Sequence, residues 1–424
     1  MSKKVKKDKS TKANMQKKVN DKVITRAILN NKKQLQNSSI QKEDFMPRGQ
    51  QLKATNKIDD KKLDKKKIEL TAKQKKIVKS QQKLATEDLE IKALANYVKI
   101  AKKKIDDLKR EVSKTVVGQE VAINHLIIGL LANGHVLVEG VPGIAKTLIV
   151  RSVATASGCA FGRIQFTPDL LPTDIIGVSI YTGDSSGKSI EKSFEILKGP
   201  VFNNFILADE INRAPPKVQS ALLESMQEHQ VTIGRRTLKL NEPFFVFATQ
   251  NPIEQAGTYQ LPEAQLDRFL FKIFVTYPKM TEEQQILNQN TTVRSFDFFK
   301  INPVLSAKDL MWMQELTRRI YLNEEIEKYI IRIVDATRYP EKYGLKDIKK
   351  YVDFGSSPRG SIGLFIGAKA NAVINGRYFV LPEDVVEVAK PVLRHRISLT
   401  YEGQAEGLTS DIIIERIIEE VPAP

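Results

Sequence analysis

A seven-residue apolar repeat runs through the N-terminal part of the chain. It places leucine, isoleucine or valine at every seventh position from residue 63 to residue 112. This heptad period predicts a long helix with a coiled-coil seam. The second seam position is polar at Lys73 and Ser80 but apolar at Leu94, Ala101 and Leu108. We therefore expect residues 88–114 to form an amphipathic helix packed on the next domain. Residues 60–87 are expected to form a charged single helix or a coil that depends on a partner.

Between residues 136 and 275, short apolar runs alternate with segments of helical periodicity. The runs typical of buried strands are 136–138, 161–166, 205–208, 244–248 and 269–275. Strands that alternate with helices predict a parallel sheet covered by helices. Two stretches, within 167–204 and 231–247, carry glycine-containing turns between strand-like residues. We expect them to form hairpins inserted into this α/β core.

The C-terminal part shows helical periodicity. After a loop-rich connection near residues 276–303, the pattern predicts helices at 307–319, 324–336, 361–375, 382–396 and 410–420. The sequence therefore predicts an α/β core followed by a helical domain. We place the domains at 1–87 for an N-terminal extension, 88–277 for the core, 278–303 for a linker and 304–424 for the helical domain.

The positive charge of the chain is concentrated in the extension. The 424 residues carry a formal net charge of +17. Residues 1–90 contain 26 Lys and Arg against 11 Asp and Glu, whereas residues 91–424 contain 41 against 39. Because residues 1–57 hold a single aromatic residue and many polar ones, we expect them to be disordered. Such a basic tail could touch nucleic acid or an anionic surface, or be a solvated tail with no dedicated partner.

Composition excludes several other classes of protein. The only cysteine, Cys159, cannot form an internal disulfide, and four scattered histidines do not form a transition-metal motif. There is no signal-peptide pattern, and no run of 18 apolar residues that could span a membrane. We expect a cytoplasmic protein.

The run from Val136 to Leu148 predicts a phosphate-binding loop. An apolar strand ends in a glycine-rich turn of Gly140, Pro142, Gly143, Ile144 and Ala145, which leads through Lys146 and Thr147 into a helix from Leu148. Backbone N–H groups of such a turn, with the positive end of the helix, bind phosphate oxygens. Lys146 would reach the β- and γ-phosphates and the Thr147 hydroxyl would hold Mg²⁺. A glycine-rich turn without a ligand is the alternative.

Polar residues at the ends of later strands strengthen the nucleotide hypothesis. Asp209 and Glu210 end the apolar run 205–208, where the first would anchor Mg²⁺ and the second would polarise a water. Asn251 follows the next run, at a position from which a polar side chain could contact the γ-phosphate. Arg359 lies in the first turn of a helix, where the dipole disfavours a cation, so an anionic ligand is expected there.

Taken together and in this order, these motifs resemble the MoxR branch of the AAA+ ATPases over residues 95–424. The segments that carry the resemblance are VVGQE, EGVPGIAKT, RIQFTPDLLPTDIIG, DEINRAPPKVQSALLESMQE, ATQNP, LPEAQLDRF and SSPRG. Alanine before the loop lysine, at Ala145, is usual in this branch. The resemblance implies an AAA+ αβα P-loop core with hairpin insertions, a helical lid, and ATP bound with Mg²⁺ between subunits of a ring that is expected to be hexameric.

The resemblance also implies roles for particular residues. Asn251 corresponds to the first sensor, Arg268 to the arginine finger that completes the neighbouring subunit's site, and Arg359 to the second sensor in the lid. The segment Val117-Gly118-Gln119 resembles the one that lies against adenine. For Arg213, an accessory role and a structural salt bridge remain equally open. The hairpins correspond to insertions at the pore or face of the ring.

The function implied is chaperone-like maturation or activation of protein clients by an ATPase, with a von Willebrand factor A-domain partner. A DNA-acting AAA+ motor tethered by the basic tail is one alternative, and a subunit of a chelatase-type motor is another. A nucleotide-dependent scaffold without catalysis is disfavoured because Glu210, Asn251 and Arg268 are all present.

Overall fold

The computed structural model describes residues 72–141, 146–181, 194–251, 257–289 and 296–424, with side chains from residue 90 onward except those of Gln289 and Asp297. The chain falls into two compact units, Met1–Asn96 and Tyr97–Pro424. The expected disorder of residues 1–57 lies outside the described residues, as do the heptad positions before residue 72. The backbone of residues 72–87 is helical and belongs to α2 Ala72–Val112. The second unit contains all the segments that carry the predicted nucleotide-binding motifs.

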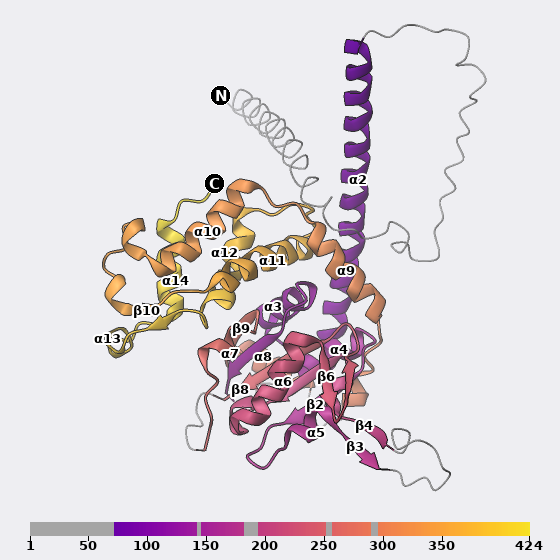
Figure 1. The fold of residues 1–424 in the computed structure, drawn as a ribbon, viewed down its shortest axis with the longest axis vertical. Coiled ribbons are helices and arrows are strands. Elements are labelled where there is room, and N and C mark those ends of the chain that lie inside the picture. Colours follow the sequence, from indigo (N-terminus) through magenta and orange to yellow (C-terminus); the bar gives the residue numbers. More distant parts are fainter. Residues whose placement is uncertain (1–71, 142–145, 182–193, 252–256, 290–295) are drawn as a thin grey trace, which may run out of the picture. The chain divides into compact units, whose positions relative to one another are not determined.

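The strands and helices of the described chain are shown in Figure 1. The strands are β1 Val136–Gly140, β2 Phe161–Gln165, β3 Gly177–Tyr181, β4 Phe194–Lys198, β5 Phe205–Asp209, β6 Gln230–Ile233, β7 Arg236–Lys239, β8 Phe245–Gln250, β9 Phe271–Val275, β10 Val352–Phe354 and β11 Ser398–Leu399. The α-helices are α2 Ala72–Val112, α3 Glu120–Leu131, α4 Lys146–Ala156, α5 Pro172–Ile176, α6 Pro216–Glu228, α7 Glu263–Leu266, α8 Met280–Gln289, α9 Ala307–Arg319, α10 Glu324–Arg338, α11 Pro358–Ile374, α12 Pro382–Leu393, α13 Tyr401–Ala405 and α14 Ser410–Glu420.

Five parallel strands form the central sheet in the order β2-β5-β8-β1-β9. The register pairs Val136 with Phe271 at the start of β1 and β9, and Gly140 with Val275 at their end. Parallel strands align their carboxyl ends at one edge of a sheet, so residues that follow β1, β2, β5 and β8 meet there. The opposite, amino edge collects the residues that precede the strands.

One face of the sheet packs against α6 and the second hairpin. Side chains alternate across a strand, and Ile206 and Ala208 of β5 lie in a buried cluster with Leu222 and Met226 of α6. Val231 of hairpin β6–β7 lies in the same cluster. Both predicted hairpins are observed, as the antiparallel pairs β3–β4 and β6–β7.

Helices α2, α3 and α4 pack on the core elsewhere. The later part of the predicted seam is confirmed, because Val98, Ala101, Ile105, Leu108 and Val112 are all at most 1% exposed. The Thr115 hydroxyl, just beyond α2, lies 2.7 Å from that of Ser152 in α4. Gly129 of α3 lies so close to Val136 that an added Cβ would be 2.7 Å from it, which permits tight packing of α3 on β1.

Helices α9 to α14 form the C-terminal helical lid, orange to yellow in Figure 1. A Cβ added at Gly367 of α11 would lie 3.4 Å from both Phe271 of β9 and Val388 of α12, so the lid packs closely against the edge strand of the sheet. The predicted fold, a parallel α/β core with a helical lid, is confirmed. Among the helices of the described residues, none combines the length and the apolar character needed to cross a bilayer.

The expectation of a loop-rich connection near residues 276–303 was partly wrong, because α8 forms there. The sequence signal for α8 lies at its N-terminus. Glu282 and Glu283 occupy the first turn, where acidic side chains favour a helix. The Glu282 carboxylate also accepts a hydrogen bond of 2.8 Å from the Lys279 backbone N–H.

Candidate functional site

The carboxyl edge of the sheet carries the lysine of the predicted phosphate loop. Gly140 ends β1 and Lys146 begins α4, with Thr147 and Leu148 in its first turn. Pro142, Gly143, Ile144 and Ala145 lie outside the described residues. The Lys146 ammonium donates a hydrogen bond of 2.7 Å to the Gly140 carbonyl. Burial lowers the pKa of Lys146, although the nearby Asp209, Glu210 and Glu139 carboxylates raise it.

Thr249 fixes Asp209 at the same edge. Asp209 ends β5, and its Oδ1 accepts a hydrogen bond of 2.7 Å from the Thr249 hydroxyl of β8. The same Thr249 oxygen accepts a hydrogen bond of 2.8 Å from the Glu210 backbone N–H. Asp209 Oδ2 pairs with the half-exposed Arg163 at 2.7 Å. The buried Thr249 hydroxyl thus fixes both the side chain of Asp209 and the backbone of Glu210.

Glu210 adopts a strained backbone and is held by two donors. Its φ of 56° lies in the left-handed region, which non-glycine residues rarely adopt and which is common at functional sites. The Gln165 amide, at the end of β2, and the Arg213 guanidinium each donate to Glu210 Oε2 at 2.9 Å. The structure therefore shows Arg213 in a salt bridge to Glu210 of its own chain, and an accessory role stays a hypothesis.

Two further predicted site segments lie near this edge. Asn251 directly follows β8 and is buried. The Gln119 amide, just after Val117 and Gly118, donates 2.9 Å to the carbonyl of Thr276, the residue after β9. Because β9 pairs with β1, this contact brings the predicted adenine segment towards the phosphate loop. Gly118, at φ 71°, lies so close to Glu282 that an added Cβ would be 2.7 Å from its carboxyl group.

Arg268 lies at the opposite, amino edge of the sheet. It precedes β9 by three residues, and the Leu270 N–H donates 2.8 Å to the carbonyl of His135, just before β1. The Arg268 guanidinium donates 2.9 Å to the Leu223 carbonyl of α6. The five-residue strands between the two edges are about 16 Å long. Arg268 is therefore separated by the sheet from the Lys146 and Asp209 edge of its own chain.

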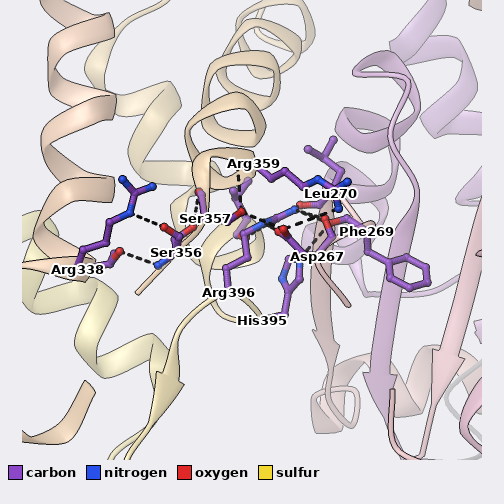
Figure 2. Close-up of polar contacts among 11 residues, drawn as sticks. Asp267, Phe269, Leu270, Arg338, Ser356, Ser357, Arg359, His395 and Arg396 are labelled. Carbon is purple, nitrogen blue, oxygen red and sulfur yellow. Dashed lines mark hydrogen bonds and ion pairs between the residues drawn. The ribbon is translucent and has the colours of Figure 1, made fainter. Parts of the chain in front are cut away.

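Arg359 is held on the same side as Arg268. Its guanidinium pairs at 3.8 Å with the Asp267 carboxylate, next to Arg268 in the chain. Figure 2 shows Arg359, Ser357 and Arg396 of the lid converging on Asp267. In the single chain Arg359 thus pairs with an acidic residue of its own chain, and the anionic ligand that the sequence predicts for it stays a prediction.

The donor set at the carboxyl edge fits Mg²⁺ bound together with a nucleotide. Asp209 and Thr147 offer hard oxygen atoms, and Mg²⁺ is commonly held by one or two carboxylates together with substrate phosphates and waters. A cation at Asp209 Oδ2 would have to displace Arg163, whose side chain is 50% exposed and also donates to the Gln165 amide oxygen. Within the described ranges, no cluster of three His, Cys, Asp or Glu forms a separate metal site.

Sequence reasoning missed three residues of this arrangement as functional candidates. Thr249 and Gln165 carry a weak signal, since each is a polar residue near the carboxyl end of a short strand. Asp267 has no sequence signal of a functional role, because its partners Ser357, Arg359 and Arg396 are about 90 or more positions away in the sequence.

Comparison with known proteins agrees with this architecture. Residues 135–271 match the profile of the ATPase family associated with various cellular activities, and residues 345–417 match that of the AAA lid domain. The chain is 48% identical to Chaperone MoxR1 of Mycobacterium tuberculosis, over 74% of this chain and 81% of that protein. It is 31% identical to Protein MoxR of Methylorubrum extorquens, over 74% and 94%. A candidate ATPase from Cytophaga hutchinsonii, known from its crystal structure, is 47% identical, superposes with a TM-score of 0.72, and covers 79% of this chain and 99% of its own. The chain belongs to the MoxR family of AAA+ ATPases.

Proposed function

We propose that this chain is a subunit of a ring ATPase in which each nucleotide is hydrolysed between two neighbouring subunits. The observation that carries the proposal is the position of Arg268 at the amino edge of the sheet, with Lys146, Asp209 and Glu210 at the carboxyl edge. An arginine separated from its own site by the sheet could take part in hydrolysis only at the site of another copy. A ring of identical subunits satisfies this need at every interface.

At the carboxyl edge, each residue has a role that its geometry supports. Lys146 brings a positive charge to the β- and γ-phosphates, and Glu210 accepts a hydrogen bond from the attacking water and orients it in line with the γ-phosphate. Asp209 and Thr147 hold Mg²⁺, which neutralises phosphate charge when bound. Asn251 would contact the γ-phosphate, and Val117-Gly118-Gln119 would contact the base. Catalysis rests on positioning and charge rather than on a covalent intermediate.

At the amino edge, Arg268 and Arg359 would be presented to the neighbouring subunit's nucleotide. In the single chain Arg268 donates to a backbone carbonyl, a neutral acceptor that a triphosphate would outcompete. An arginine of this kind contributes about 10³–10⁵ to the hydrolysis rate. Hydrolysis would therefore depend on assembly.

The first hairpin supports a protein as the client. Ile180, Tyr181, Phe194 and Leu197 of β3 and β4 are 46%, 62%, 42% and 60% exposed. The rings of Tyr181 and Phe194 lie 5.3 Å apart. An exposed apolar patch on a two-stranded arm is typical of a protein-binding surface. The near balance of charge in residues 91–424 also disfavours a nucleic-acid track through the ring.

Chaperone-like remodelling with a von Willebrand factor A-domain partner completes the proposal. It rests on the resemblance to MoxR proteins, one of which is named as a chaperone. The proposal of six subunits in the ring also rests on this resemblance. Partner capture by a tagged Glu210→Gln chain, with ATP and with ADP, would test this part: nucleotide-dependent recovery of an A-domain protein is expected.

The test of the proposed function is the steady-state ATPase rate against protein concentration. We expect the rate per chain to rise with concentration and to level off where sedimentation shows complete rings. Glu210→Gln should bind ATP in a ring without hydrolysing it, and Arg268→Ala should lose activity while still binding ATP. A rate per chain that is constant with concentration and unaffected by Arg268→Ala would overturn the proposal.

A further inference from the structure

The backbone on both sides of Arg268 is held by one buried arginine of the lid. Arg396 lies just beyond α12, and its side chain is 3% exposed. Its guanidinium donates to the carbonyls of Asp267 at 3.3 Å, Phe269 at 2.7 Å and Leu270 at 3.1 Å. His395 contacts the Phe269 carbonyl as well, at 3.0 Å. The segment that carries Arg268 is therefore fixed to the lid by its main chain (Figure 2).

The Asp267 carboxylate joins that segment to the start of α11. Its Oδ1 accepts 2.7 Å from Arg396 Nε, and its Oδ2 accepts 2.9 Å from the Ser357 hydroxyl. The ion pair with Arg359 uses the same Oδ2, at 3.8 Å. Ser357 is the N-cap of α11 and accepts a hydrogen bond from the Arg359 backbone N–H. Both Asp267 oxygens are thus used to align three lid residues.

The loop before α11 is fixed from its other side too. The Ser356 N–H donates 2.9 Å to the Thr337 hydroxyl near the end of α10, and Arg338 Nε donates 2.7 Å to the Ser356 carbonyl. The Arg359 guanidinium remains half-exposed and its distance to Asp267 exceeds a hydrogen bond. Its backbone is therefore fixed while its charged end can exchange Asp267 for a stronger anion.

We propose that Asp267 is a positioning residue that sets Arg268 and Arg359 in one register, so that a subunit presents both arginines to its neighbour's nucleotide as a unit. This inference rests on the proposed function. Asp267 does not touch the nucleotide. It holds the Arg359 side chain beside the Arg268 segment before assembly and keeps the two backbones aligned afterwards. Misplacement of a catalytic group by about 1 Å can cost about 100-fold in rate, which is why such alignment matters.

The direct test is Asp267→Asn, which keeps the shape of the side chain and an oxygen to accept from Arg396. The substitution removes the charge that attracts Arg359 and turns the acceptor facing Ser357 into an amide group. We expect kcat to fall by about 10- to 100-fold. The KM for ATP should change less, because Lys146 and the phosphate loop of each site are untouched. An unchanged kcat would overturn the inference.

Mixing subunits separates positioning from damage to the variant's own site. Glu210→Gln has an inactive site but an intact amino edge, whereas Asp267→Asn has an intact site but a misaligned amino edge. In random equimolar rings, about one site in four combines the two intact halves. We expect the mixture to exceed the activity of an equal total amount of Asp267→Asn alone. If the mixture has half the activity of Asp267→Asn alone or less, the defect lies within the variant's own site or fold.

A second variant covers the case in which Asp267→Asn fails to fold. Ser357→Gly removes the hydroxyl that donates to Asp267, while glycine remains an acceptable N-cap. Ser306→Gly is the matched control, because Ser306 is the N-cap of α9 and its hydroxyl also donates to an aspartate, but to Asp309 rather than to Asp267. Ser357→Gly should lower kcat several-fold, and mixing with Glu210→Gln subunits should restore activity. Ser306→Gly should keep the native rate. Equal rates for the two would contradict the inference.

Arg268→Ala distinguishes failure of this inference from failure of the proposed function. If Arg268→Ala is inactive and recovers on mixing with Glu210→Gln, while Asp267→Asn loses kcat without recovering, only the role of Asp267 is wrong. If Arg268→Ala keeps native activity, or fails to recover on mixing, the shared site itself is wrong.

Discussion

The side-chain amide of Gln165 donates a hydrogen bond of 2.9 Å to Glu210 Oε2. Gln165 and Asp209 are register partners on the neighbouring strands β2 and β5, so the contact is built into the sheet. In the proposed mechanism Glu210 would orient a water for attack on the γ-phosphate. We expect that the hydrogen bond from Gln165 would then have to be released, so that it would hold Glu210 in a resting position.

Gln165→Ala should raise the rate of hydrolysis. A hydrogen bond to a charged group contributes about 1.5–3 kcal/mol, and Arg213 still holds the same oxygen of Glu210 in the variant. We expect a few-fold increase in kcat at saturating ATP, measured on assembled protein. A fall in kcat would show that Gln165 instead orients Glu210 productively.

Thr249→Val should weaken both stability and the response to Mg²⁺. The change is isosteric but leaves Asp209 Oδ1 and the Glu210 N–H without the partner that fixes them. The free energy of unfolding should fall by about 1–3 kcal/mol, and half-maximal ATPase activity should need several-fold more Mg²⁺.

Thr317→Val is the matched control for Thr249→Val. Thr317 is equally buried, and its hydroxyl donates within α9 to Met313. This variant should keep the native Mg²⁺ dependence. If both variants shift that dependence equally, the contact of Thr249 with Asp209 has no specific role.

Stability should fall as the pH drops from 7 to 5, in part because of His135. Burial lowers the pKa of this histidine to about 4, from an ordinary value of 6.5. Its Nδ1 accepts from the Val246 N–H at 3.1 Å, so a proton there would oppose a donor. The unfolded chain binds the proton more readily, so the stabilisation is complete above pH 6.5 and is lost as the pH falls towards 4. At pH 5 the loss is on the order of 2 kcal/mol.

Urea unfolding of His135→Gln at pH 7 and pH 5 checks this assignment. Glutamine offers an acceptor and a donor without titrating in this range, so its stability should depend less on pH than that of the native chain. His229→Gln is the control, since His229 lies beside His135 but is partly exposed. If the free energy of unfolding of His135→Gln falls between pH 7 and pH 5 as much as that of the native chain, the prediction is wrong.

Deleting residues 1–87 should leave the ATPase rate per chain and its dependence on concentration within about two-fold of the native values. The expected disorder of residues 1–57 and the excess positive charge of the extension give it no predicted role in the site. Unchanged values would exclude a role in assembly. Stimulation of the full chain by DNA at modest salt, lost on deletion, would instead favour the DNA-acting alternative.

The sequence allowed the fold to be predicted because local patterns specify it. The apolar runs of β1, β5 and β8 and the glycine-rich turn before Lys146 each carry their own signal. Helix α8 was missed because it is mostly exposed and carries only three apolar residues, Met280, Ile286 and Leu287.

The candidate site could be predicted only as separate motifs. Nothing in the local sequence indicates that Gln165 and Arg213 would share an oxygen of Glu210. The cluster at Asp267 depends on lid residues brought to it by tertiary packing. Such contacts between distant segments become visible only when the register of the strands and the docking of the lid are known.

The most direct test of the shared site is to mix two inactive variants, Glu210→Gln and Arg268→Ala. Each supplies the half of the site that the other lacks, and about one interface in four of a random ring would be complete. We predict that hydrolysis absent from either variant alone appears on mixing, at about a quarter of the native rate. Continued absence of hydrolysis in rings shown to contain both variants would contradict a site shared between subunits.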